Sequence, residues 1–191
     1  TLIACLQQVK SWSDAHPAHV PIAILVELKD DTLELGDFPF VTPEKWTTPG
    51  LDSLDAEIRS VFDPSDLITP DDVRGTHPTL DEAVTTDGWP TLESSRGKVM
   101  FLMDNGGGYR SDYLAGHPAL AGRVLFTNAE PGDADAAFVK MNNSSDEDLI
   151  AQRVLAGYVV RTRADSDTDE GRTGDTSTRD AALRSGAQWV S

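Results

Sequence analysis

Residues 137–163, AFVKMNNSSDEDLIAQRVLAGYVVRTR, hold two short apolar runs separated by an amphipathic segment. The runs 137–142 and 158–163 are rich in β-branched and aromatic residues, which predicts two strands. The segment between them, 146–156, carries apolar residues at helical spacing and stops at Gly157, a typical residue after a helix. A strand, a helix and a second strand in succession predict a parallel pair joined by a crossover helix.

The same reasoning extends this unit in both directions along the chain. It predicts further strands over 22–29, 98–104, 123–127 and 188–191. It predicts helices that end before His16, that span about 51–61, and that run from a cap at Asp175 or Thr176 to Gly186. We expect the segment 32–49 to be a long excursion over the strand ends and the segment 63–96 to be irregular. We expect loops at Gly106–Gly108 and at 165–170.

The predicted fold class is therefore α/β, with parallel strands and crossover helices in one domain, 1–191. Side chains on separate strands alternate so that polar residues share one side, and a barrel interior lets every strand direct such residues at a common axis. This favours an incomplete TIM-like (β/α) barrel with its N-terminal strands missing over an open doubly wound sheet. The abrupt start in a helix at Thr1 suggests a segment of a longer protein.

Composition restricts the class of partner. The chain has 191 residues, 16 Lys plus Arg and 32 Asp plus Glu, so its formal net charge is −16. This excess repels nucleic acid, which is excluded as a partner. Cys5 lies among apolar residues at helical spacing, so we expect it to be buried. The acidic surface favours a soluble, secreted protein, and we expect a monomer.

Charged side chains recur at the carboxyl ends of the predicted strands. In three strands one face ends in a polar pair: Glu27 and Lys29, Lys140 and Asn142, and Arg161 and Arg163. Asp104 closes the predicted strand 98–104, and Asp165 follows the predicted strand 158–163. Because parallel α/β enzymes build their sites at these strand ends, we expect one shared site.

Four cations that converge on one mouth indicate an anionic ligand, because phosphate oxygens would offset the cost of desolvating them. The expected phosphate-binding residues are Lys29, Lys140, Asn142, Arg161, Arg163 and Asp165, and Lys29 and Arg161 are the catalytic candidates. The alternative is a structural network in which the cations pair with Glu27, Asp104 and Asp165. Glu27, with Asp104, could hold a divalent cation such as Ca²⁺. None of His16, His19, His77 and His117 is predicted at a strand end that faces the cations.

Three stretches of the chain resemble bacterial calcium-dependent phosphatidylinositol-specific phospholipase C. They are HVPIAILVELKDD (19–31), LITPDDVRGTHPTLDEAVTTDGWPTLESSRGKVMFLMDN (67–105) and GYVVRTRADSDTDEGRTGDTSTRDAALRSGAQWVS (157–191). The resemblance implies a TIM-like barrel, secretion, and cleavage of phosphatidylinositol to diacylglycerol and an inositol phosphate through attack by the inositol 2-hydroxyl. It assigns Glu27 as a calcium ligand and the cations as phosphate or inositol ligands.

The family places a catalytic histidine and further calcium ligands on strands that have no counterpart in this sequence, so we expect the 191-residue chain to be inactive alone. Transient contact with a membrane surface would use loops such as 38–46. A related phosphodiesterase, such as a glycerophosphodiester phosphodiesterase, is one competing interpretation. A non-catalytic acidic α/β domain is the other.

Overall fold

Two small parallel sheets form the framework of the protein. The computed structural model describes residues 1–33, 36, 40–166 and 168–191. Within this part of the chain, the first sheet has the order β1-β2-β3 and the second the order β4-β5-β6. Their bounds are β1 Ile22–Val26, β2 Val99–Met103, β3 Leu125–Thr127, β4 Phe138–Lys140, β5 Val159–Thr162 and β6 Trp189–Val190. Every strand pair is parallel, which confirms the predicted α/β class with parallel strands.

The predicted incomplete barrel is not confirmed, because the strands divide into two sheets. A single parallel bridge between Asn128 and Phe138 links β3 to β4. Both strands have only three residues, and the ten residues between them, 128–137, form an irregular loop with turns rather than a crossover helix, so the ladder between them stays this short. The six strands nevertheless follow one another in sequence order.

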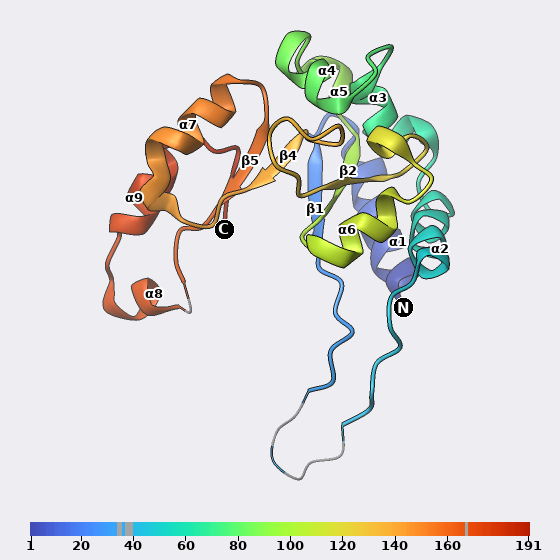
Figure 1. Ribbon diagram of the computed structural model, residues 1–191, viewed down its shortest axis with the longest axis horizontal. Coiled ribbons are helices and arrows are strands. Elements are labelled where there is room, and N and C mark those ends of the chain that lie inside the picture. The colour runs from blue at the N-terminus through green and yellow to red at the C-terminus, as the bar shows by residue number, and fades with distance from the viewer. Residues whose placement is uncertain (34–35, 37–39, 167) are drawn as a thin grey trace.

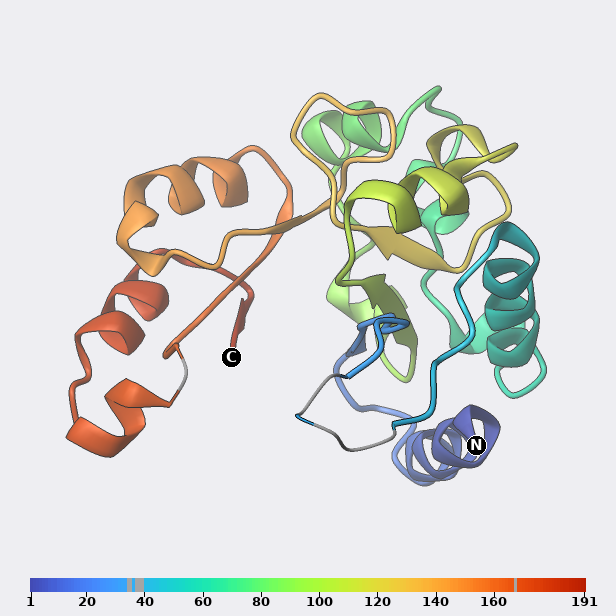
Figure 2. The same cartoon turned by 60° about the horizontal axis from the view of Figure 1, so that its bottom comes forward.

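Helices surround the two sheets. The α-helices of the described chain are α1 Leu2–Ala15, α2 Thr48–Arg59, α3 Pro70–Arg74, α4 Leu80–Thr86, α5 Leu92–Ser95, α6 Gly107–Leu114, α7 Glu147–Leu155, α8 Asp169–Thr173 and α9 Ser177–Arg184. Short 3₁₀ turns cover Pro64–Asp66, Pro118–Leu120 and Ser144–Asp146. Figure 1 shows α7, α8 and α9 with β4 and β5 as one lobe, beside a larger lobe that holds β1, β2 and the other helices. The turned view in Figure 2 keeps the two lobes apart.

Two predicted loops contain helices. Gly107 and Gly108, expected in a flexible turn, open α6, and the acidic stretch after β5 contains α8. Tyr109 and Tyr113 lie four residues apart on α6, and Tyr113 is completely buried. Burial of this aromatic face offsets the low helix propensity of the glycines.

The main core lies under the first sheet. All five residues of β2 and all three of β3 are buried. Helix α2 covers this sheet with apolar residues at helical spacing, Leu51, Leu54 and Ile58, and all three are buried. Cys5 is exposed, so its predicted burial was wrong: Leu6 is the residue of α1 that is buried against the core.

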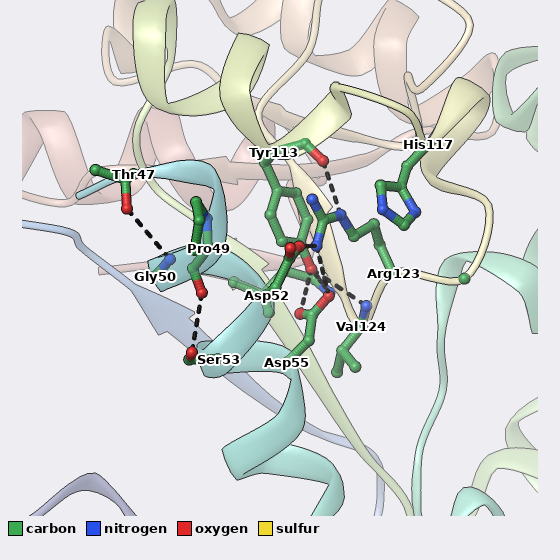
Figure 3. Close-up of polar contacts among 12 residues, drawn as sticks. Thr47, Pro49, Gly50, Asp52, Ser53, Asp55, Tyr113, His117, Arg123 and Val124 are labelled. Carbon is green, nitrogen blue, oxygen red and sulfur yellow. Dashed lines mark hydrogen bonds and ion pairs between the residues drawn. The ribbon is translucent and has the colours of Figure 1, made fainter.

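A buried polar cluster fixes α2 and α6 at the amino end of β3. Arg123 donates from Nε to the Tyr113 carbonyl oxygen at 2.8 Å and lies over the Tyr113 ring, 4.3 Å from its centroid. Asp55 accepts hydrogen bonds from the Tyr113 hydroxyl and from Arg123, as Figure 3 shows. Burial raises the pKa of Asp55, although both donors oppose that shift. The cluster lies opposite the carboxyl ends of the strands and is a packing feature.

The excursion after β1 begins and returns at one place. Its described arms, 31–33 and 40–46, extend from the carboxyl end of β1 (Figure 1). Lys45 and Trp46 return to contact Asp30, where the excursion starts. Among the described residues no helix is both long and apolar enough to cross a bilayer.

Candidate functional site

Glu27 and Asp104 lie side by side at the carboxyl end of the first sheet. In the register of β1 and β2, Val26 is opposite Met103, and the Asp104 amide donates to the Val26 carbonyl oxygen at 2.8 Å. Glu27 and Asp104 each follow these partners directly, so they occupy equivalent positions. In a pleated pair, equivalent positions share one face of the sheet. The strand register therefore places both carboxylates on the same face.

Glu27 and Lys29 form an ion pair that faces solvent. The distance from Lys29 Nζ to Glu27 Oε2 is 3.2 Å, and the two side chains are 75% and 54% exposed. In the described chain no other carboxylate pairs with Lys29. An exposed pair of this kind is weak, so a stronger ligand can replace either partner.

Lys140 connects the two sheets at the predicted site. Its Nζ lies 2.9 Å from Asp104 Oδ2 and donates to the Asp104 carbonyl oxygen at 2.8 Å. The backbone amide of Lys140 donates to the Asn128 side chain at 2.9 Å, which fixes the end of β4. The sequence left open an alternative in which the cations only pair with nearby carboxylates. Lys140 makes such a pair, with Asp104.

Among the described residues, Arg161 has no carboxylate partner. In the register of β4 and β5 it lies opposite Lys140, and its guanidinium donates to Asn142 and to the Ser191 hydroxyl. Its Nε is buried and has no hydrogen-bond partner in the described chain. Burial lowers the pKa of Arg161, the positive charge of Arg163 adds to this effect, and Asp104 opposes it.

Two adjoining pockets lie beside these arginines. One, of about 390 Å³, is lined by Asn142, Arg163 and Asp165, with Ser166, Glu170, Thr178 and the turn 143–145. The other, of about 220 Å³, is lined by Arg161, Arg163, Asp165, Ser166 and Ser191. Among described residues, neither arginine has a carboxylate within ion-pair distance. Two arginines without an ion-pair partner among the described residues, in polar pockets that Asp165 and Glu170 also line, are suited to bind a phosphate or another anion.

The structure thus brings Asp104, Lys140, Asn142, Arg161, Arg163 and Asp165 together, while Glu27 lies at the strand position equivalent to Asp104 and Lys29 pairs with Glu27. Their functional roles stay predictions. Ser166 and Ser191 also line the site and were missed by the sequence reasoning. Ser191 could have been found, because it follows the apolar end of β6 in the way that Asp104 follows β2.

The four histidines lie away from this cluster. His16 stacks on Trp12 with 4.2 Å between ring centroids, and His19 contacts Ser13 before β1 begins. His77 contacts Asp87, and His117 contacts the Ala121 carbonyl oxygen. No histidine of this chain therefore faces the cations, as expected from the sequence.

Calcium prefers oxygen ligands, six to eight in number. The carboxylate of Glu27 fits this chemistry better than that of Asp104, because its one ion-pair partner among the described residues is the exposed Lys29. Asp104 fits less well, because the half-buried Lys140 already holds it. The described residues contain no group of three or more histidine, cysteine or acidic side chains placed to hold a metal. This chain can therefore supply part of a calcium site.

The comparison with known families gives one match that covers the whole chain. Residues 1–191 match the family described as phosphoinositide phospholipase C, Ca²⁺-dependent. No curated protein sequence matches the chain.

Solved structures with a similar fold include two bacterial enzymes. One is the calcium-dependent phosphoinositol-specific phospholipase C of a Pseudomonas species, in a myoinositol complex, with a TM-score of 0.67 and 22% identity over 99% of this chain. The other is the Ca²⁺-dependent phosphatidylinositol-specific phospholipase C of Streptomyces antibioticus, with a TM-score of 0.66 and 21% identity over 98% of this chain. The chain spans 63% of the first protein and 69% of the second.

Proposed function

Because the chain belongs to the calcium-dependent phosphoinositide phospholipase C family, we propose that the complete protein cleaves the phosphodiester bond of phosphatidylinositol or a closely related lipid. This chain contributes the phosphate-binding part of the site. The observation that carries the proposal is the pair Arg161 and Arg163, which line the pockets without a carboxylate partner among the described residues.

The cations of the second sheet bind and orient the phosphate. Arg161 is fixed by Asn142 and Ser191, so its guanidinium enters the site in one orientation and loses little conformational entropy when an anion binds. Arg163 adds a second charge at the same pocket wall. Charge on the phosphate oxygens grows as the reaction proceeds, and fixed donors in a half-buried site stabilise that charge better than water does.

The reaction is an internal displacement at phosphorus. The 2-hydroxyl oxygen of inositol forms a bond to phosphorus, the bond from phosphorus to the diacylglycerol oxygen breaks, and that oxygen gains a proton as diacylglycerol leaves. Bound calcium, with Glu27 as a ligand, would polarise a phosphoryl oxygen and the attacking hydroxyl. Lys29 lies next to Glu27 and would stabilise negative charge on the phosphate from the side of the first sheet.

The proton of the 2-hydroxyl needs an acceptor that the described histidines do not provide. All four of them contact groups outside the cluster. We therefore expect the 191-residue chain to bind an inositol phosphate weakly and to be inactive alone. In the complete protein we propose that further strands extend the two sheets into a barrel and carry the base and the other calcium ligands.

Secretion, a monomeric state and transient contact with a lipid surface belong to the same proposal. The part of the excursion expected to reach the lipid, 38–46, falls partly outside the described residues. Its described portion contains Val41, which is 88% exposed, and an exposed aliphatic side chain of this kind suits contact with a lipid surface.

Substitution of Arg161 tests the function. In the complete protein with calcium, Arg161→Ala should lower kcat/KM on phosphatidylinositol in mixed micelles by about 100-fold, as expected when a fixed donor to a reacting oxyanion is removed. Arg184→Ala is the matched control, because Arg184 pairs with Glu147 on the outer helices and should leave kcat/KM unchanged.

Product analysis by ³¹P NMR separates the alternatives. A cyclic inositol phosphate supports attack by the internal hydroxyl, whereas release of glycerol phosphate from a glycerophosphodiester would assign the chain to the other phosphodiesterase class. Absence of turnover on both substrates, with unchanged phosphate binding in Arg161→Ala, would favour a non-catalytic domain.

A further inference from the structure

The chain continues in an extended, alternating form beyond the end of β1. Strand β1 ends at Val26, yet burial alternates through the next four residues: Glu27 and Lys29 are exposed, whereas Leu28 and Asp30 are only 3% and 5% exposed. An alternation with a period of two is the signature of a strand with one buried face. Something other than a neighbouring strand must therefore hold this segment.

The side chain of Asn105 takes the place of that neighbouring strand. Its Oδ1 accepts a hydrogen bond from the Leu28 amide at 2.6 Å, and its Nδ2 donates to the Leu28 carbonyl oxygen at 2.9 Å. A neighbouring parallel strand would offer the same donor and acceptor to one residue, and a single carboxamide can supply both. Asn105 therefore fixes the backbone at Leu28, between Glu27 and Lys29.

Asp30 is a second fixed point two residues later. Its carboxylate accepts from the Tyr109 hydroxyl at 2.6 Å and from the Trp46 amide at 2.9 Å. Lys45 Nζ donates to the Asp30 carbonyl oxygen at 2.7 Å. With both buried residues of the segment held, rotation of the segment about its own axis is blocked, and Glu27 and Lys29, which alternate with them, must point to the opposite face.

We propose that Asn105 is a positioning residue for Glu27 and Lys29. It holds the segment after β1 as a pseudo-strand, so that the carboxylate and the ammonium lie on its exposed face, opposite Leu28 and Asp30, before any ligand binds. This inference rests on the proposed function, because it assigns Asn105 a task in presenting those two side chains. Asn105 itself makes its hydrogen bonds to the backbone and is not a ligand of the substrate.

The same chemistry occurs elsewhere in the protein and provides a control. Gln188 accepts from the Val160 amide at 2.8 Å and donates to the Tyr158 carbonyl oxygen at 3.4 Å, at the amino end of β5 and away from the site. Loss of either carboxamide removes two hydrogen bonds to a strand end. Only the loss of Asn105 releases the backbone that carries Glu27 and Lys29.

The test compares Asn105→Ala with Gln188→Ala in the complete protein. The measurements are calcium affinity by calorimetry, kcat and KM on phosphatidylinositol, hydrogen exchange of the Leu28 amide, and the melting temperature. Asn105→Ala should weaken calcium binding by about tenfold, as expected for a residue that orients a metal ligand. It should also lower kcat with little change in KM and speed exchange at Leu28.

Gln188→Ala should lower the melting temperature by a similar amount and leave calcium affinity, kcat and exchange at Leu28 unchanged. The inference is overturned if the two variants lower calcium affinity and kcat equally, or if neither lowers them while the wild-type protein is active. A wild-type protein that neither binds calcium nor cleaves the lipid would instead overturn the proposed function, and the inference with it.

Discussion

The two sheets of this protein differ in how deeply their strands are buried and in how the charged residues at their carboxyl ends are paired. In the first, every residue of β2 and β3 is buried, and Glu27 and Asp104 at its carboxyl end each have a lysine partner. In the second, β5 alternates between half-buried and buried residues, and its arginines have no carboxylate partner among the described residues. We therefore expect the first sheet to contribute most of the stability. The cations without an ion-pair partner among the described residues belong to the second sheet.

Substitution in the Arg123 cluster should give the largest loss of stability, because the cluster is buried in the larger lobe, beside the first sheet. Arg123→Met removes the guanidinium beside Asp55, a carboxylate that is only 7% exposed, and leaves that charge without its cation. We expect the free energy of unfolding to fall by about 3–5 kcal/mol in guanidinium chloride titrations. Arg184→Ala, which breaks an exposed pair in the other half, should cost less than about 1 kcal/mol. Equal losses of unfolding free energy in Arg123→Met and Arg184→Ala would contradict the expectation that the first sheet contributes most of the stability.

The contact between the two lobes, at Gly157 and α4, should give the next largest loss of stability on substitution. Gly157 has a φ of +102°, and a Cβ placed there would lie 2.1 Å from the Val84 carbonyl oxygen of α4. Because both the backbone conformation and the neighbouring carbonyl oppose a side chain, Gly157→Ala should cost more than about 2 kcal/mol in thermal unfolding. Gly174 also has a positive φ, +75°, but open space around it, so Gly174→Ala should cost about 1 kcal/mol. If the two costs are the same, the halves do not depend on this close approach.

Acid should weaken the turn that joins the sheets. Burial by itself would raise the pKa of Asp135, but hydrogen bonds from Arg110 and Thr127 outweigh it, and the pKa lies below its usual value. A carboxyl with a lowered pKa in the folded state stabilises the protein fully above about pH 4, and that contribution is lost as the pH falls through the folded value.

Asp135→Asn should therefore cost about 2 kcal/mol at pH 7, as expected when a charged hydrogen-bond acceptor is neutralised. The difference between wild type and variant should shrink as the pH falls below about 4, measured by urea unfolding at a series of pH values. A difference that grows on acidification would show that Asp135 is not the charged partner of Arg110.

The parity of the strands was predictable from the sequence, but the pairing of their side chains was not. Alternation in 22–29 and 158–163 is a local property of the chain, and the burial of Leu28 and Thr162 agrees with it. The partners of Lys140 and Arg161 come from residues 19 to 36 positions away, and only the three-dimensional fold brings them within reach. The charged residues at the strand ends could be identified from the sequence. Which of the cations form an ion pair with a carboxylate could not.

The errors have the same origin. Three consecutive glycines predict a turn, but contacts with residues distant in sequence, such as the packing of Tyr113 against Arg123, stabilise Gly107–Leu114 as a helix. Apolar residues occur all around the first turns of α1, so periodicity could not show that Leu6 rather than Cys5 faces the core. Both outcomes depend on neighbours distant in sequence, which local patterns do not contain.

The smallest effect on stability should come from a residue with a large effect on function. Glu27 is more than half exposed and its pair with Lys29 is screened by water, so Glu27→Gln should change the free energy of unfolding by less than about 0.5 kcal/mol. The same change removes a charged oxygen ligand and should weaken calcium binding in the complete protein, measured by calorimetry. Glu147→Gln breaks a comparable outer pair with Arg184 and should leave calcium affinity unchanged. A large loss of stability in Glu27→Gln, with normal calcium binding, would make this carboxylate part of the scaffold and would remove it from the proposed calcium ligands.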